Sequence, residues 1–223
     1  MTRHVLDDPG GLTERARRFL AKHSRHTRLE LADGQPVGGP AGGRQRLEEF
    51  IARFGGLWFC RERPGCERRH RWGYDFNGFV ESGWESTGPG DWVATVGDAD
   101  GWPLTLDWTT GRIGIDVVGP RTWIAESAEN LIESSALGQA LRGDRSWHEV
   151  ALSTVDADVF HGLVPEVAEA SSPWNRWYLD DRAAVHAWAE TYELPRRTVV
   201  VAWYRDAEGR RRIESVAGPL RDR

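Results

Sequence analysis

The chain has 223 residues, of which 39% are hydrophobic and 28% charged, and its formal net charge is −5. A chain of this length and composition can bury most of its apolar surface in one large domain without metal ions or disulfides. The acidic balance argues against a general nucleic-acid binder. No apolar run approaches the roughly 20 residues of a membrane span, and the first residues lack the apolar core of a signal peptide, so we expect a cytoplasmic protein.

The N-terminal part predicts two helices joined by a loop. Thr13 is a suitable N-cap for a helix over residues 14–23, whose apolar side chains fall on one side and whose arginines fall on the other. Residues 32–43 contain five glycines and two prolines, which cannot continue a helix. A short apolar run at residues 57–60 predicts a strand. The second helix precedes that strand and has an apolar stripe at i, i+3, i+4 and i+7, formed by Leu47, Phe50, Ile51 and Phe54.

The strongest periodic patterns lie between Trp92 and Leu141 and predict an antiparallel meander closed by a helix. A short strand near residues 122–124 precedes Ser127, a good N-cap for a helix that extends to about Leu141. Three longer strands come before it, separated by a turn at Gly97 to Gly101 and a second glycine-containing turn. These predicted strands are residues 92–96, 102–108 and 112–118.

The C-terminal part predicts a helix followed by a β-hairpin. Asp181 is a possible cap for a helix over residues 182–192. The β-branched run at 198–204 predicts a strand, and the sequence Asp206 to Gly209 predicts a turn toward a second strand at 212–216. Before this helix, residues 147–159 show no decisive period, so we expect short helices or loops there.

Together these elements predict an α+β fold, with an antiparallel sheet of about five to seven strands and helices packed mainly on one face. We expect an N-terminal helix and glycine-rich loop at residues 1–43 and an α+β core at 44–145. A C-terminal helix and β-hairpin extension at 146–223 would pack on the same domain.

Two cysteines and a histidine raise the question of a metal site. Cys60, Cys66 and His70 form a C-x5-C-x3-H run, and thiolate and imidazole ligands suit Zn²⁺. However, no fourth ligand is evident and the spacing is not that of a standard zinc module. We therefore favour a structural role, expect no metal or other cofactor, and expect both cysteines to be free thiols in a reducing compartment.

The chain also contains residue types used in hydrolysis. Aspartates recur along the meander, and His148, His161 and His186 are possible general bases. An Asp/His-based or metal-dependent hydrolase is therefore an alternative function, which predicts a deep pocket where carboxylates and imidazoles converge. No nucleophile elbow or zinc-protease helix motif is present in the sequence.

Two segments carry a resemblance to a known family. The helix from Leu47 to Leu57, and the strand and helix from Trp123 to Glu133, resemble the SUKH superfamily of bacterial immunity proteins, over roughly residues 45–141. The resemblance implies N-terminal helices, a central antiparallel sheet and no catalytic residues. It further implies that the protein binds and neutralises a toxin, often a nuclease or deaminase, in the cell that produces it.

Twelve tryptophans are an unusual number for this chain length, and tryptophan is enriched in protein-protein hot spots. We expect an interaction surface at the loop edge of the meander, where indole anchors with a carboxylate rim would suit a basic partner such as a toxin domain. The alternative is that the indoles are buried and the aspartates only solvate turns. The candidate residues are Trp84, Asp91, Asp98, Asp100 and Trp102.

Overall fold

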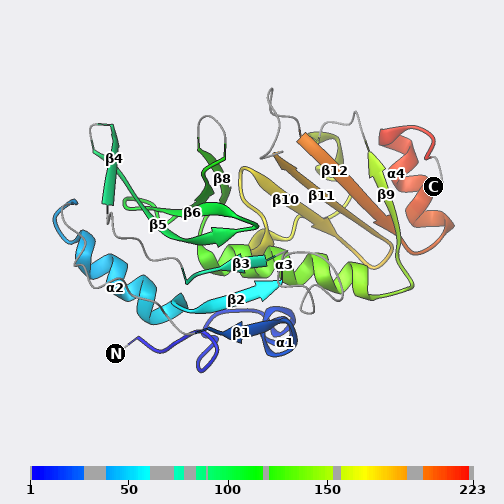
Figure 1. Ribbon diagram of the computed structural model, residues 1–223. Helices are drawn as coiled ribbons and strands as arrows, with labels where there is room; N and C mark the ends of the chain where they lie inside the picture. The colour runs from blue at the N-terminus through cyan, green and yellow to red at the C-terminus, as the bar shows by residue number, and fades with distance from the viewer. Residues whose placement is uncertain are drawn as a thin grey trace.

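The computed structural model describes residues 2–27, 39–60, 73–77, 84–88, 90–117, 121–152, 157–189 and 198–220. Over these ranges the chain forms four α-helices and 12 β-strands. The strands form two sheets in which every neighbouring pair is antiparallel, so the predicted α+β class with an antiparallel sheet is confirmed. The long helix α3 (Ala128–Gly143) runs beside both sheets (Figure 1).

The larger sheet contains the predicted meander. Its strand order is β1-β2-β3-β5-β6-β7-β8, and β4 pairs with β5 outside this path. A tight turn at Asp100 and Gly101, whose φ angles are 56° and 91°, joins β5 to β6. The strands are β1 (Ser24–His26), β2 (Leu57–Cys60), β3 (Gly73–Asp75), β4 (Trp84–Gly88), β5 (Asp91–Ala99), β6 (Trp102–Asp107), β7 (Ile113–Ile115) and β8 (Thr122–Ala125).

The turn was predicted to begin at Gly97, but β5 continues to Ala99. Gly97 serves a different purpose, because a Cβ atom at this position would lie 2.1 Å from the backbone oxygen of Asp75 in β3. The missing side chain lets two strands approach closely beside a bulge in the β5–β6 pairing. The sequence predicted Gly97 to be the first residue of a turn, and only the tertiary structure shows that it allows β3 and β5 to approach closely.

The second sheet was not predicted. Its order is β10-β11-β12-β9, with β9 (His148–Leu152), β10 (Asn175–Leu179), β11 (Ala183–Ala189) and β12 (Thr198–Tyr204). The helix expected at residues 182–192 is wrong, because β11 occupies 183–189. β11 is an inner strand with both faces covered, so its residues from Ala183 to Ala187 are all buried and show no polar alternation. A short apolar run of this kind does not distinguish a strand from a helix.

The expected C-terminal hairpin is also wrong. β12 is present as predicted, but the segment that follows is the helix α4 (Ala207–Ala217). Asp206 caps this helix, because its Oδ1 accepts the backbone N–H of Gly209 at 2.8 Å. An aspartate three residues before a glycine is common both in turns and at helix starts, and here the helix-start interpretation was the right one.

The other helices have the predicted caps. α1 (Glu14–His23) begins at Thr13, whose hydroxyl accepts from the backbone N–H of Ala16. α2 (Gly43–Phe54) contains the predicted apolar stripe and ends at Gly55, the first of two consecutive glycines. α3 begins at Ser127, whose hydroxyl accepts from the backbone N–H of Asn130.

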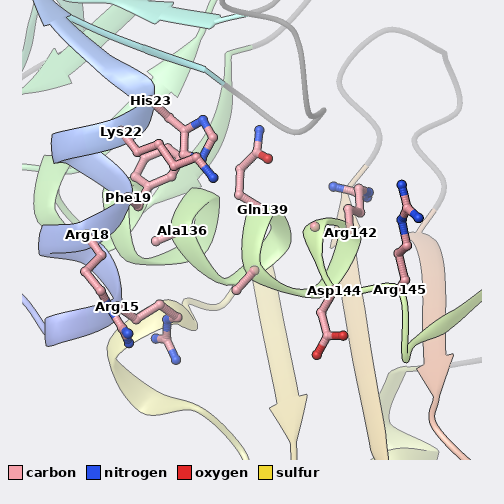
Figure 2. Close-up of a pocket in the computed structure, with 12 residues that line it drawn as sticks. Arg15, Arg18, Phe19, Lys22, His23, Ala136, Gln139, Arg142, Asp144 and Arg145 are labelled. Atoms are coloured by element: carbon pink, nitrogen blue, oxygen red, sulfur yellow. The ribbon is translucent and has the colours of Figure 1, made fainter.

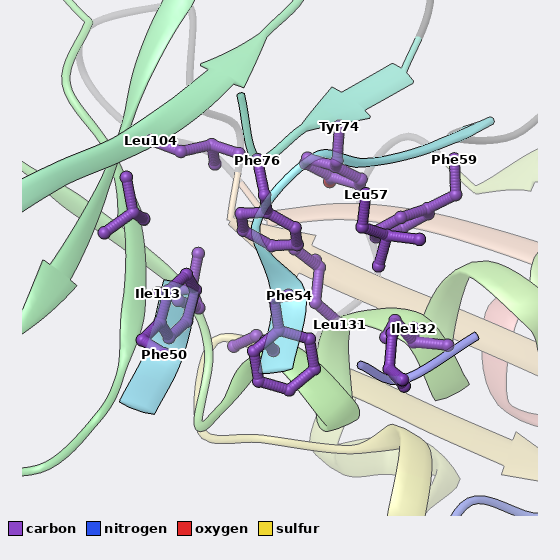
Figure 3. Packing of buried hydrophobic residues seen from close by; sticks show 14 of the residues in the cluster. Phe50, Phe54, Leu57, Phe59, Tyr74, Phe76, Leu104, Ile113, Leu131 and Ile132 are labelled. Carbon is purple, nitrogen blue, oxygen red and sulfur yellow. The ribbon is translucent and has the colours of Figure 1, made fainter. Parts of the chain in front are cut away.

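α3 belongs to two hydrophobic cores at once. The N-terminal half contributes Leu131 and Ile132 to the core of the larger sheet, where α1 and α2 also pack (Figure 3). The C-terminal half contributes Leu137 and Leu141 to a second core with Trp177 and other residues of the smaller sheet. Because nearly the whole circumference of α3 is buried, its polar side chains must find partners inside the protein.

Candidate functional site

One of these buried polar side chains fixes α1 on α3. The Glu133 side chain is 4% exposed and accepts three hydrogen bonds: from the backbone N–H of Thr13 at 2.6 Å, from the Thr13 hydroxyl at 2.7 Å and from Arg15 Nη2 at 3.3 Å. A buried carboxylate requires such donors, and its charge is favourable at the N-terminus of α1. The contact sets the position at which α1 crosses α3.

A cleft of about 690 Å³ lies between α1 and the C-terminal half of α3 (Figure 2). Its wall is strongly basic, with five arginine and lysine side chains against one aspartate, although the chain as a whole is acidic. α1 provides Arg15, Arg18, Phe19, Lys22 and His23, and α3 with the turn after it provides Ala136, Gln139, Ala140, Arg142, Gly143, Asp144 and Arg145.

The α1 wall is a line of positive charge. Arg15, Arg18 and Lys22 are spaced i, i+3 and i+7, which places them on one side of the helix, over a length of about 10 Å. The opposite side of α1 buries Ala16 and Leu20 in the core. The amphipathic pattern that docks α1 therefore also directs its cations toward the cleft.

The cations differ in how far they are already neutralised. Arg15 forms ion pairs with Glu133 and Glu169, both at 3.3 Å, and Arg142 forms one with Glu149 at 3.1 Å. Arg18 lies 3.8 Å from Glu14 in an exposed pair, which contributes little. Lys22 and Arg145 form no ion pair with any residue that the structure describes.

The single carboxylate on the wall does not neutralise these cations. Asp144 pairs with Arg205 at 3.0 Å and points away from Arg142 and Arg145 (Figure 2). A hydrogen bond from the backbone N–H of Ser146 is the main reason why the pKa of Asp144 lies below its ordinary value, so this group stays ionised. Lys22 and Arg145 therefore keep positive charges that no described carboxylate neutralises, which favours anionic ligands.

The floor of the cleft reaches the predicted Cys/His run. Gln139 is buried and donates from Nε2 to Cys60 Sγ at 3.2 Å. The expectation of a free thiol at Cys60 is wrong, because this residue is disulfide-bonded and so offers no thiolate to a metal ion. Cys66 and His70 lie outside the described residues. Across the described ranges, no group of three or more His, Cys, Asp or Glu side chains is placed to hold a metal ion.

The predicted acidic surface does not form one cluster. Trp84 is buried, 4% exposed, and packs edge-to-face on Trp108 with ring centroids 5.5 Å apart, so it is a core residue and not an exposed anchor. Asp91 begins β5 and Asp98 lies near its end, which separates the two by about 23 Å along the strand.

Three of the five candidates do meet at the β5–β6 turn. Asp98 Oδ1 accepts the backbone N–H of Gly101 at 2.8 Å, and Asp100 Oδ1 accepts that of Gly73 at 2.9 Å. The partly exposed Trp102 begins the next strand. The two aspartates serve the turn and the neighbouring strand, as the alternative interpretation of turn chemistry supposed.

The three histidines considered as general bases lie on different segments. His148 is exposed on β9 and stacks on Tyr204, whereas His161 follows a short 3₁₀ turn at the surface. His186 is buried on β11 and stacked between Trp177 and Trp188. The described residues therefore do not bring these imidazoles together in a pocket.

The sequence reasoning missed the basic cleft. The signal on α1 was present in the spacing of its cations, which were interpreted only as the solvated side of an amphipathic helix. The second wall comes from the end of α3 and the turn after it, more than a hundred residues further along the chain. The two walls are far apart in the sequence, and they form one cleft because Glu133 of α3 binds Thr13 at the start of α1.

No family model, curated protein or solved structure matches this chain. None of the helices in the described ranges is long and apolar enough to cross a membrane. What the chain does must therefore be inferred from its own geometry, which is that of an α+β protein with a basic cleft between two helices.

Proposed function

We propose that this protein is a non-enzymatic binding module that receives an acidic segment of a partner protein in the cleft between α1 and α3. The observation that supports it is the gathering of five arginine and lysine side chains around one cleft of an acidic protein. Guanidinium groups form directed, charge-assisted hydrogen bonds with carboxylates, and such bonds are stronger than those between neutral groups.

The charge distribution favours a protein over a nucleic acid. A nucleic acid presents a continuous line of phosphates, and a chain whose formal net charge is −5 would repel those that extend beyond the cleft. A short acidic segment of a protein places its charge only where the cations are. The partner is therefore a protein whose contact residues include aspartate or glutamate.

The size of the cleft limits what enters it. Its volume of about 690 Å³ is within the range of roughly 300–1,000 Å³ that holds small ligands. That space accommodates a few side chains and not the face of a folded domain. A partner protein would insert one short segment here and make its other contacts on the rim of α1 and α3.

The resemblance to SUKH immunity proteins supplies the kind of partner. We propose a toxin domain, nuclease-like or deaminase-like, that this protein neutralises by binding in the cytoplasm without a cofactor. A basic toxin was expected from the aspartates of the meander, but Asp91 lies far from the others along β5, and Asp98 and Asp100 accept hydrogen bonds at the β5–β6 turn. The cleft instead requires that the segment of the toxin that enters it is acidic.

A binding assay with a defined probe tests the proposal. A fluorescently labelled octapeptide rich in glutamate should bind the parent protein, and the variant Lys22→Glu/Arg145→Glu should bind it at least ten-fold more weakly. The control Arg44→Glu/Arg211→Glu changes the net charge equally at exposed positions on α2 and α4. Equal loss in the control, or tighter binding of a single-stranded RNA of the same charge, would overturn the proposal.

The toxin is tested separately by co-expression with the protein encoded next to this one in its genome. The parent should restore growth and co-purify with that protein. The Lys22→Glu/Arg145→Glu variant should do neither, whereas the α2 and α4 control should do both. Growth inhibition that the parent does not relieve would count against a toxin as the partner.

A further inference from the structure

Two arginines of the cleft, Arg15 and Arg142, each form an ion pair with a glutamate whose side chain is about half exposed. Arg15, on the α1 wall, contacts Glu169 at 3.3 Å, and the Glu169 side chain is 45% exposed. Arg142, on the α3 wall, contacts Glu149 at 3.1 Å, and the Glu149 side chain is 48% exposed. Neither glutamate lines the cleft.

These two pairs differ from the third carboxylate contact at the site. Glu133 is buried and accepts from the Thr13 backbone and hydroxyl as well as from Arg15, so it is part of the packing of α1 on α3. Glu169 and Glu149 have solvent on one side, and water weakens an ion pair with a half-exposed carboxylate relative to a buried one. Another carboxylate can take the place of Glu169 on Arg15, and one that replaces Glu149 on Arg142 must also accept the indole N–H of the buried Trp203.

We infer that Glu169 and Glu149 act as internal competitors of the ligand, occupying Arg15 and Arg142 in the free protein and giving way when an acidic segment binds. This inference rests on the proposed function of the cleft. An incoming carboxylate exchanges one charge-assisted hydrogen bond for another at each arginine. Because the two arginines lie on opposite walls, a ligand that displaces both glutamates bridges α1 and α3 with two acidic groups.

Glu169 and Glu149 lower the affinity of the cleft for any acidic ligand, and they increase its selectivity for ligands with two acidic groups. A ligand with one acidic group displaces at most one glutamate, and the other stays on its arginine. A ligand with two suitably spaced groups gains both contacts, and the glutamates that it releases are solvated. The site therefore discriminates by charge number as well as by charge sign.

Isosteric substitutions test the inference. Glu169→Gln and Glu149→Gln remove the competing charge while keeping a side-chain oxygen, which for Glu149 preserves an acceptor for the indole N–H of Trp203. Each variant should bind the glutamate-rich octapeptide about two- to five-fold more tightly than the parent, and the double variant should combine both gains. Glu48→Gln makes the same charge change at an exposed pair on α2 and is the matched control.

The outcomes separate this inference from the function on which it rests. If Glu169→Gln and Glu149→Gln tighten binding no more than Glu48→Gln does, the glutamates are not competitors, while peptide binding by the parent still supports the cleft. If the octapeptide binds neither the parent nor any variant, the proposed function itself fails. A peptide with a single glutamate in a serine background occupies only one arginine at a time, so the gains of the two substitutions should not combine in the double variant, and combined gains for this peptide would contradict the bridging ligand.

Discussion

The imidazole of His186 lies parallel to the indole of Trp177, with ring centroids 3.7 Å apart and planes inclined by 5°. His186 also hydrogen-bonds to the side-chain oxygen of Asn175, whose amide donates to Ser134 Oγ at 2.8 Å. The Trp177 indole N–H donates to the same hydroxyl at 2.8 Å. Ser134 of α3 thus accepts two hydrogen bonds from the smaller sheet, and it joins that sheet to the helix that forms one wall of the cleft.

Because Ser134 accepts both hydrogen bonds, we expect its substitution to lower the stability of the protein. Replacing it by alanine leaves two buried donors, Asn175 Nδ2 and Trp177 Nε1, without their acceptor, so the free energy of unfolding should fall by about 1–3 kcal/mol. Urea denaturation measures this loss. Ser135→Ala is the matched control, because this neighbouring serine is also buried but accepts no side-chain hydrogen bond from the smaller sheet in the described residues. Equal losses in both variants would show that the two hydrogen bonds add no stability of their own.

The attachment of α1 gives a second prediction. In Glu133→Gln the side chain keeps one oxygen for the donors of Thr13 and loses its charge beside Arg15, so the variant should lose about 1.5–3 kcal/mol of stability. Amide hydrogen exchange should quicken in α1 more than in α3, because the contact holds α1 whereas most of α3 is buried in the two cores. Glu126→Gln, an exposed position before α3, is the control. Unchanged exchange in α1 would contradict the role assigned to Glu133.

Much of this arrangement was predictable from local sequence. Thr13 and Ser127 are N-caps with side-chain oxygens, and both helices begin where these residues predicted. The strands of the meander are also present, although β5 is longer and β7 shorter than predicted, and their turns contain glycines at positions of positive φ, such as Gly101. Signals of this kind act within a few residues, and so they can be interpreted without the tertiary structure.

The predictions from sequence were wrong for features that depend on tertiary packing. β11 lies inside a sheet covered on both faces, and its alanines and tryptophan are compatible with a helix until the neighbouring strands are known. Two of the five partner-binding candidates, Trp84 and Asp91, are close to the β5–β6 turn in the sequence. They are distant from it in space, because the long strand β5 lies between Asp91 and the turn. The cleft was missed because its walls are brought together by one buried carboxylate, Glu133, and sequence patterns do not show such long-range contacts.

The N-terminal segment should make stability depend on pH. The pKa of His4 lies below its ordinary value of 6.5, first because the ring is partly buried and second because of electrostatic repulsion from His26, whose ring centroid lies 4.5 Å away. Arg53 also lowers this pKa, whereas Asp7 and a hydrogen bond with the backbone of Gly55 raise it. The folded protein therefore binds this proton less readily than the unfolded chain. The contribution of His4 is complete above about pH 6.5 and is lost as the pH falls below that value.

The variant His4→Gln checks this dependence. Urea midpoints of the parent should decrease between pH 7.5 and 5, and those of the variant should decrease less over the same interval. His161→Gln, which replaces an exposed histidine remote from the N-terminal segment, should keep the slope of the parent. A variant His4→Gln whose midpoints follow those of the parent at every pH would show that His4 does not set the slope.

Gly97 gives the last prediction, which concerns the spacing of strands next to the β5–β6 turn. In Gly97→Ala the new methyl group would lie 2.1 Å from the backbone oxygen of Asp75, and neither atom belongs to a flexible side chain that can move away. Relief requires β3 to separate from β5, so the variant should lose about 3 kcal/mol or more of its free energy of unfolding. Gly11→Ala is the control, because a Cβ there meets no atom within 4 Å and should change the stability little. A Gly97→Ala protein as stable as the control would mean that β3 and β5 can separate at no cost, and that the glycine is not what allows their close approach.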